Sequence, residues 1–101
     1  MPKSAILSDS ERSRERAILI PPRIWDELDS YEKNLQTKFI RAFRLVSKNL
    51  GHPSLRVELI RQRPQSLYRV RVDPNYRIHL ELWTHYYLIL AVGPHRLQGI
   101  G

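Results

Sequence analysis

Two stretches of the chain, residues 67–72 and 76–82, carry charged side chains at every second position. Side chains two residues apart on a β-strand point to the same face, so each stretch predicts a strand with one apolar and one charged face. The charged positions are Arg69, Arg71, Arg77, His79 and Glu81. Guanidinium groups can only position and stabilise anions, whereas an imidazole also titrates near neutral pH. The pattern therefore indicates a sheet face reserved largely for arginines.

A turn joins these two stretches, and a further strand follows them. Residues 73–75 read Asp-Pro-Asn, in which proline fixes φ for the second position of a turn and the flanking side chains hydrogen-bond to nearby backbone. Residues 86–92 are apolar throughout, which is typical of a central strand covered on both sides. These three strands predict a mostly antiparallel meander.

Two helices and two more strands are expected before the meander. A short β-branched run at 17–20 predicts an edge strand, and the prolines that follow it suit the start of a helix. A second helix is predicted from about residue 32 to 50, and residues 55–61 alternate as a strand. The order β-α-α-β-β-β-β is an α+β fold, with two N-terminal helices packed on one face of a twisted sheet.

The polar side of the second predicted helix is basic. Its cationic residues are Lys33, Lys38, Arg41, Arg44 and Lys48, and no Asp or Glu occurs between residues 33 and 57. A helix built for solubility normally places Glu four residues from Lys or Arg. Two interpretations stay open: the helix faces phosphate groups, or its basic face is merely solvated.

Length and composition restrict the class of protein. The 101 residues suit one domain, and we expect a mobile polar lead at 1–15 followed by a single domain at 16–101. Cysteine is absent, which excludes disulfides and thiolate–metal sites, and the histidines lack zinc-ligand spacing, so we expect no metal and no cofactor. No apolar run approaches the ~20 residues of a membrane span, and we expect a soluble, cytoplasmic protein.

The net charge of +7 is unevenly distributed along the chain. Residues 1–32 hold five basic and seven acidic residues, whereas residues 33–101 hold twelve basic and three acidic. A field of that sign attracts polyanions such as mRNA, ribosomal RNA or an acidic protein segment. The alternative is that the charge chiefly keeps the protein soluble.

The order of elements and four short sequences resemble the RelE/ParE superfamily of toxins from bacterial toxin–antitoxin modules. The sequences are His52-Pro53 after the long helix, Leu67-Tyr-Arg-Val-Arg71, Asn75-Tyr-Arg-Ile78 and Ala91-Val-Gly-Pro-His95, within a resemblance that spans about 17–96. The family's RNase branch implies metal-independent cleavage of mRNA in the ribosomal A site, with the message on the concave face of the sheet. The resemblance also implies a cognate antitoxin as partner.

The resemblance implies roles for several residues. Arg77 matches the arginine that binds and stabilises the scissile phosphate, and Arg69 and Arg71 match a basic pair on the preceding strand. His95 falls where one RNase subgroup has a catalytic histidine. No tyrosine follows Tyr87, although some members use one beyond the last strand.

The general base of such a reaction stays open at this stage. The subgroup with the histidine pairs it with a glutamate before the basic strand, for which Glu58 is the candidate and Glu81 a rival. His79 shares the arginine face but matches no family motif. Arg77 has a structural alternative, which is to pair with Glu81 or Asp73 across the hairpin.

Further phosphate and RNA contacts are predicted at Arg61, Lys48, Arg44 and Tyr76. Tyr76 is adjacent to Arg77 and can stack on a base, although tyrosines are also ordinary sheet formers.

The favoured hypothesis is a ribosome-dependent endoribonuclease toxin neutralised by an acidic or amphipathic antitoxin segment. One alternative is a gyrase-inhibiting toxin of the same fold, and another is an RNA-binding domain without catalysis, because fold alone does not fix function.

Overall fold

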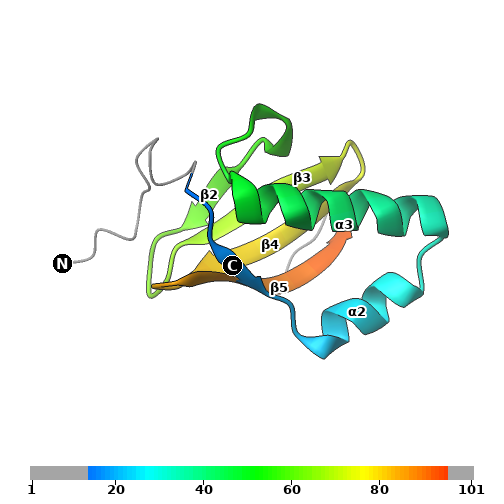
Figure 1. The fold of residues 1–101 in the computed structure, drawn as a ribbon, viewed down its shortest axis with the longest axis horizontal. Helices are drawn as coiled ribbons and strands as arrows, with labels where there is room; N and C mark the ends of the chain where they lie inside the picture. The colour runs from blue at the N-terminus through cyan, green and yellow to red at the C-terminus, as the bar shows by residue number, and fades with distance from the viewer. Residues whose placement is uncertain (1–13, 96–101) are drawn as a thin grey trace.

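The computed structural model describes residues 14–95, so nearly all of the predicted polar lead lies outside the described residues. Within that range, five strands form one sheet, and two helices cover one of its faces (Figure 1). The elements are β1 (Ala17–Leu19), α2 (Pro22–Asp29), α3 (Lys33–Lys48), the 3-10 turn η2 (Pro53–Leu55), β2 (Glu58–Arg61), β3 (Leu67–Asp73), β4 (Tyr76–Leu82) and β5 (Tyr86–Pro94). The predicted α+β order is confirmed.

The sheet has the strand order β1-β5-β4-β3-β2. β1 runs parallel to β5, and the other neighbours are antiparallel. β5 is therefore a central strand, as its apolar sequence predicts. Its two faces differ, because Tyr87 and Ile89 are fully buried while Leu88 is only half-buried. We expected β5 to be buried on both faces, but only the face with Tyr87 and Ile89 is fully buried.

The core lies between the helices and one face of the sheet. α3 contributes Phe39 and Val46, which are fully buried, and β3 and β4 contribute alternate residues such as Val70 and Ile78. The Phe39 ring stacks on Tyr31 at a centroid distance of 5.7 Å. Truncating a buried aromatic of this kind costs about 3–5 kcal/mol. Arg69, Arg71, Arg77 and Glu81 alternate with these core positions and so face away from the helices.

The helices have the predicted starts. Pro22 occupies the first turn of α2, where its missing N–H leaves no helical hydrogen bond unmade. α3 ends at Lys48, two residues before the predicted end. Neither of these helices, nor any other helix within residues 14–95, is long and apolar enough to cross a membrane.

The strand predicted at 55–61 begins later than expected. Leu55 belongs to a 3-10 turn, which the His52 imidazole caps by accepting a hydrogen bond from the Ser54 N–H at 3.2 Å. Arg56 then has φ 42°, a left-handed conformation that no strand residue adopts. The extended run can therefore start only after this residue, and β2 begins at Glu58.

Candidate phosphate-binding site

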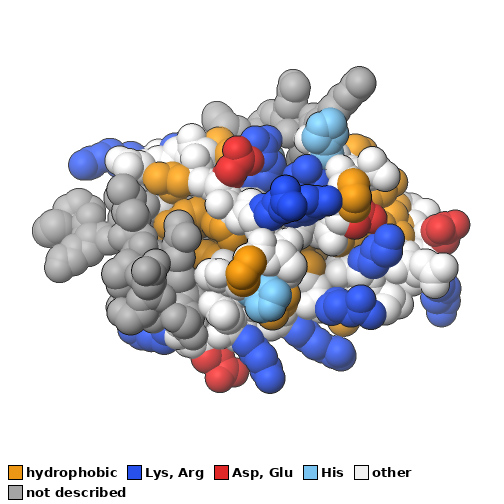
Figure 2. All heavy atoms as spheres, turned by 90° about the horizontal axis from the view of Figure 1, so that it is seen from above, with side chains coloured by type: hydrophobic (Ala, Val, Ile, Leu, Met, Phe, Trp, Pro, Cys, Tyr) orange, Lys and Arg blue, Asp and Glu red, His pale blue; other side chains and the backbone are white. Residues whose placement is uncertain are grey.

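The pairing register brings the predicted arginines together on the face of the sheet opposite the helices, called here the arginine face. Across β3 and β4, Arg69 is paired with His79 and Arg71 with Arg77, and Glu58 of β2 is paired with Arg69. Side chains paired in this way have Cβ atoms roughly 4.5–5.5 Å apart. In the view from above, Lys and Arg side chains gather across the middle of the molecule (Figure 2).

The Arg77 side chain is held by main-chain carbonyl groups. Its Nη1 donates to the carbonyl oxygen of Asp73 at 2.7 Å and to that of Tyr76 at 2.9 Å. The carboxylates of Asp73 and Glu81 instead bind Lys38 and Arg61, so the predicted structural pairing of Arg77 is absent among residues 14–95. Carbonyl contacts fix the guanidinium without neutralising it, and they leave its other N–H groups available to an anion.

Positive charge is crowded at this position. Burial lowers the pKa of Arg77, and the neighbouring Arg71 and Arg69 cations lower it further. Asp73 and Glu58 act in the opposite direction without cancelling the effect. Like charges directly opposed across a sheet destabilise it, and an anion bound between Arg71 and Arg77 would remove that repulsion.

Two other arginines on this side of the sheet are paired with carboxylates. Arg69 Nε donates to Glu58 Oε1 at 3.0 Å, and Arg61 Nη2 lies 2.7 Å from Glu81 Oε2. Glu81 also accepts a hydrogen bond from Trp83 Nε1 at 3.0 Å. Both sequence-derived candidates for the general base, Glu58 and Glu81, are therefore engaged as counter-ions.

His95 lies beside the turn that holds Arg77. It directly follows β5, and its N–H donates to the carbonyl oxygen of Asn75 at 2.6 Å. Gly93 is paired with Arg77, so the end of β5 runs along the same corner of the sheet. The His95 side chain is exposed there. The structure thus brings Arg71, Arg77 and His95 to one end of the arginine face.

Tyr76 lies on the other side of the sheet. Its ring packs against Tyr31 and Phe39, with centroid distances of 5.6 and 6.0 Å. The ring is therefore directed toward the helices and not toward the arginine face, and its stacking on a base stays a prediction.

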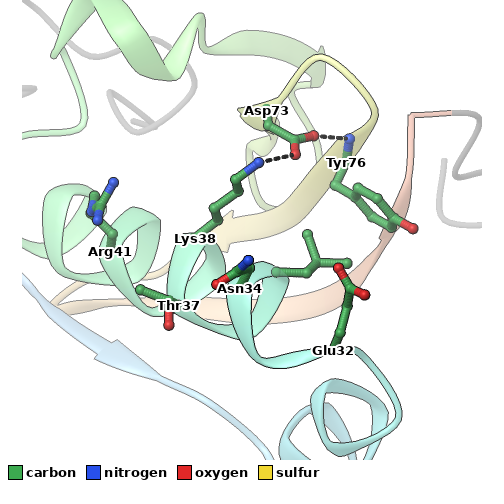
Figure 3. Close-up of a pocket in the computed structure, with 8 residues that line it drawn as sticks. Glu32, Asn34, Thr37, Lys38, Arg41, Asp73 and Tyr76 are labelled. Carbon is green, nitrogen blue, oxygen red and sulfur yellow. Dashed lines mark hydrogen bonds and ion pairs between the residues drawn. The ribbon is translucent and has the colours of Figure 1, made fainter.

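The basic residues of α3 are also separate from the arginine face. Arg44 and Lys48 are exposed on the helical layer. Lys38 instead reaches the β3–β4 turn, where its Nζ lies 3.2 Å from Asp73 Oδ2 in a pocket of about 530 Å³ (Figure 3). A smaller cavity of about 110 Å³ is lined by both Arg41 and Arg71, so α3 approaches the arginine face only at its edge.

The Asp73 carboxylate organises the turn. It accepts hydrogen bonds from the N–H groups of Asn75 and Tyr76 at 2.8 and 2.9 Å. Burial alone would raise its pKa, but these bonds and the Lys38 ammonium lower the pKa on balance. Asp73 therefore fixes the backbone whose carbonyl groups hold Arg77.

His79 is the residue of this face to which the sequence assigns no role. Only 4% of it is exposed, and neither ring nitrogen has a hydrogen-bond partner within the described part of the chain. Burial and then the Arg69 cation lower its pKa. Its alternation with Arg77 and Glu81 shows which face it occupies, but nothing in the sequence shows its burial.

Among residues 14–95, no three His, Asp or Glu side chains come together in a way that would hold a metal ion.

No protein-family model and no curated protein matches the chain. Solved structures are similar to it. A chain of the archaeal RelE–RelB complex from Pyrococcus horikoshii OT3 superposes with a TM-score of 0.65 at 19% identity, covering 78% of this chain and 93% of that chain. A copper-bound mutant toxin from Helicobacter pylori has a TM-score of 0.53 at 12% identity, covering 80% of this chain and 96% of that chain. The chain therefore has the RelE fold, as its sequence predicts.

Proposed function

We propose that the protein is the toxin of a toxin–antitoxin module and that it cleaves mRNA on the ribosome without a metal ion. The observation that carries the proposal is the Arg71–Arg77 pair on a RelE fold. Within residues 14–95 neither guanidinium has a carboxylate partner, and Arg77 is already fixed by carbonyl groups. A fixed guanidinium at Arg77, with the Arg71 cation opposite it, would bind a phosphodiester group and stabilise the extra charge of its transition state.

The proposed reaction is attack of a ribose 2′-hydroxyl on the adjacent phosphate. It needs a base for the hydroxyl, an acid for the departing 5′-oxygen and cations for the dianionic phosphorane. Arg71 and Arg77 supply the cations, and His95, at the end of β5 beside the turn, is the candidate acid. The products would carry a 2′,3′-cyclic phosphate and a 5′-hydroxyl.

Two macromolecular partners follow from this proposal. The similarity to a chain of a RelE–RelB complex supports a protein antitoxin, and the net charge of +7 favours an acidic segment of it. The same charge favours contact with ribosomal RNA around the message.

The test adds purified protein to a translating extract and maps RNA ends. We expect the wild type to cut messages and leave cyclic phosphate ends, and Arg77→Ala and His95→Ala to leave them intact. His85→Ala is the matched control, because His85 is exposed in the loop before β5. Intact messages with the wild type would contradict the proposal. Cleaved gyrase–DNA complexes would then indicate the gyrase-inhibiting branch.

A second candidate function is RNA binding without catalysis. The observation that favours it is that Glu58 and Glu81 both serve as counter-ions to arginines, so neither carboxylate is a free base before RNA binds. This candidate predicts salt-dependent affinity for RNA, because phosphate contacts release counter-ions, with no turnover.

A further inference from the structure

His79 occupies a buried position beside the phosphate-binding arginines. It lies two residues after Arg77 on the same face of β4, directly opposite Arg69 of β3 and Ala91 of β5. It is 4% exposed, and within residues 14–95 both ring nitrogens lack a hydrogen-bond partner. A buried polar group without a partner destabilises a fold, so stability does not explain why a histidine occupies this position.

The surroundings of His79 keep its imidazole unprotonated. Burial and the Arg69 cation lower its pKa, so the imidazole is neutral at pH 7 and has a nitrogen lone pair to offer. The charged groups around it are Arg69 from β3, Arg77 and Glu81 from its own strand, and Glu58 of β2 beyond Arg69. On β5, Ala91 is paired with His79 and Gly93 with Arg77.

We propose that His79 is the general base of the RNA-cleavage site and takes the proton of the attacking 2′-hydroxyl. This inference rests on the proposed function. Residues two apart on a strand are separated by roughly 6.6 Å, so a phosphate held at Arg77 brings the neighbouring ribose over His79. The base then lies on the same strand as the arginine that fixes the phosphate.

The step balances without any further reactant. The 2′-hydroxyl proton passes to a nitrogen of His79, and the 2′-oxygen lone pair forms a bond to phosphorus. The bond from phosphorus to the 5′-oxygen breaks, and its electrons stay on that oxygen, which takes a proton from His95. The imidazolium left at His79 returns its proton to water after the products leave.

Access to the imidazole depends on a weak contact and small neighbours. The Glu58–Arg69 pair is 61% and 30% exposed at its two side chains, and exposed ion pairs of this kind are easily broken. A phosphate can therefore draw Arg69 away from Glu58. On the other side of His79, its β5 partner Ala91 has a small side chain, and Gly93 opposite Arg77 has none.

The first test is the kinetics of His79→Gln in single-turnover cleavage of ribosome-bound mRNA. Glutamine keeps the size of the side chain but takes up no proton near neutral pH. We expect the cleavage rate to fall about 10²–10⁴-fold with RNA affinity unchanged. In the wild type, protonation of His79 should lower the cleavage rate as the pH falls. This pH dependence should be absent in His79→Gln. His85→Gln is the matched control and should cleave like the wild type.

A second measurement uses the wild type and so does not depend on the folding of a variant. The His79 ring resonances are followed by NMR during titration with RNA that carries a 2′-deoxy sugar at the cleaved position. A phosphate at Arg77 should shift these resonances and raise the pKa of His79, because an anion stabilises the imidazolium. The His85 resonances should not move.

The outcomes separate this inference from the proposed function. Cleavage by the wild type together with an undiminished rate in His79→Gln overturns the inference and leaves the proposed function standing. The inference is also overturned if the His79 resonances do not shift when RNA is added. A wild type that cuts no message contradicts both, whereas loss of rate with unchanged affinity supports both.

Discussion

Both ends of the arginine face contain arginine, but the arginines have different neighbours at the two ends. At the end next to the loop between β4 and β5, Arg61 of β2 is paired with Glu81 of β4, which also accepts a hydrogen bond from Trp83. At the β3–β4 end, Arg71 directly faces Arg77, and within residues 14–95 neither is paired with a carboxylate. We call the first group the paired end and the second the free end.

The difference distinguishes arginines that stabilise the protein from arginines that are available to a ligand. An ion pair whose carboxylate also accepts a further hydrogen bond ties strands together. Two guanidiniums facing each other repel, and a fold tolerates this arrangement when it serves binding. Mutations at the paired end should therefore affect stability, and mutations at the free end should affect activity.

Substitution of Arg77 should have the largest effect. We expect Arg77→Ala to lower the rate of message cleavage about 10²–10³-fold, because it removes a preorganised donor to the transition state. Arg61→Ala, its matched control at the paired end, should change the rate little. Single-turnover cleavage of ribosome-bound mRNA measures both. Equal losses in the two variants would abolish the distinction between the ends.

Removing Glu81 should affect stability instead. We expect Glu81→Ala to lower the free energy of unfolding by about 1–3 kcal/mol, because it leaves the partly buried Arg61 and the Trp83 N–H without their acceptor. The more exposed Glu58 is the control, and Glu58→Ala should cost less than about 0.5 kcal/mol. Urea denaturation measures both values. A Glu81 variant as stable as the wild type would show that the paired end is not structural.

Arg71 should contribute one phosphate contact. We expect Arg71→Gln to reduce the slope of log affinity against log salt by about 1, whereas Arg61→Gln leaves it unchanged. RNA binding over a series of salt concentrations gives the slopes. A reduction with Arg61→Gln alone would place the phosphate at the paired end.

Acidification should produce a smaller effect that depends on His79. Its pKa is lowered in the folded chain, so the unfolded chain binds more protons as the pH falls through the ordinary value of 6.5. The folding stability is therefore greatest above that value and decreases as the pH falls toward the folded pKa. As the pH falls from about 8 to 5, the urea midpoint of the wild type should therefore decrease relative to that of His79→Gln. A constant difference would contradict this assignment.

Most of the fold is predictable because its patterns are local. Alternation over 67–82 and the apolar run at 86–92 define three strands within two residues of their observed ends. The strand predicted at 55–61 starts late because Arg56 takes a left-handed conformation, which its residue type does not indicate. A single residue of this kind moves the start of a strand without altering the alternation of apolar and polar residues in the sequence around it.

The site is less predictable than the fold, because partners depend on register. Alternation shows that Arg69, Arg71 and Arg77 share a face, but only the pairing of strands shows that Arg71 and Arg77 face each other. The same register engages Glu58 and Glu81 as counter-ions. Their roles as catalytic residues, like those of Arg77 and His95, stay predictions.

The most direct test of the free end follows the arginine side chains themselves. The Nε–H resonances of arginine are observed by NMR while non-cleavable RNA is added. We expect saturable shifts at Arg71 and Arg77 and none at Arg61, which stays bound to Glu81. Shifts at Arg61, or shifts confined to the arginines of α3, would contradict the assignment of the phosphate to Arg71 and Arg77.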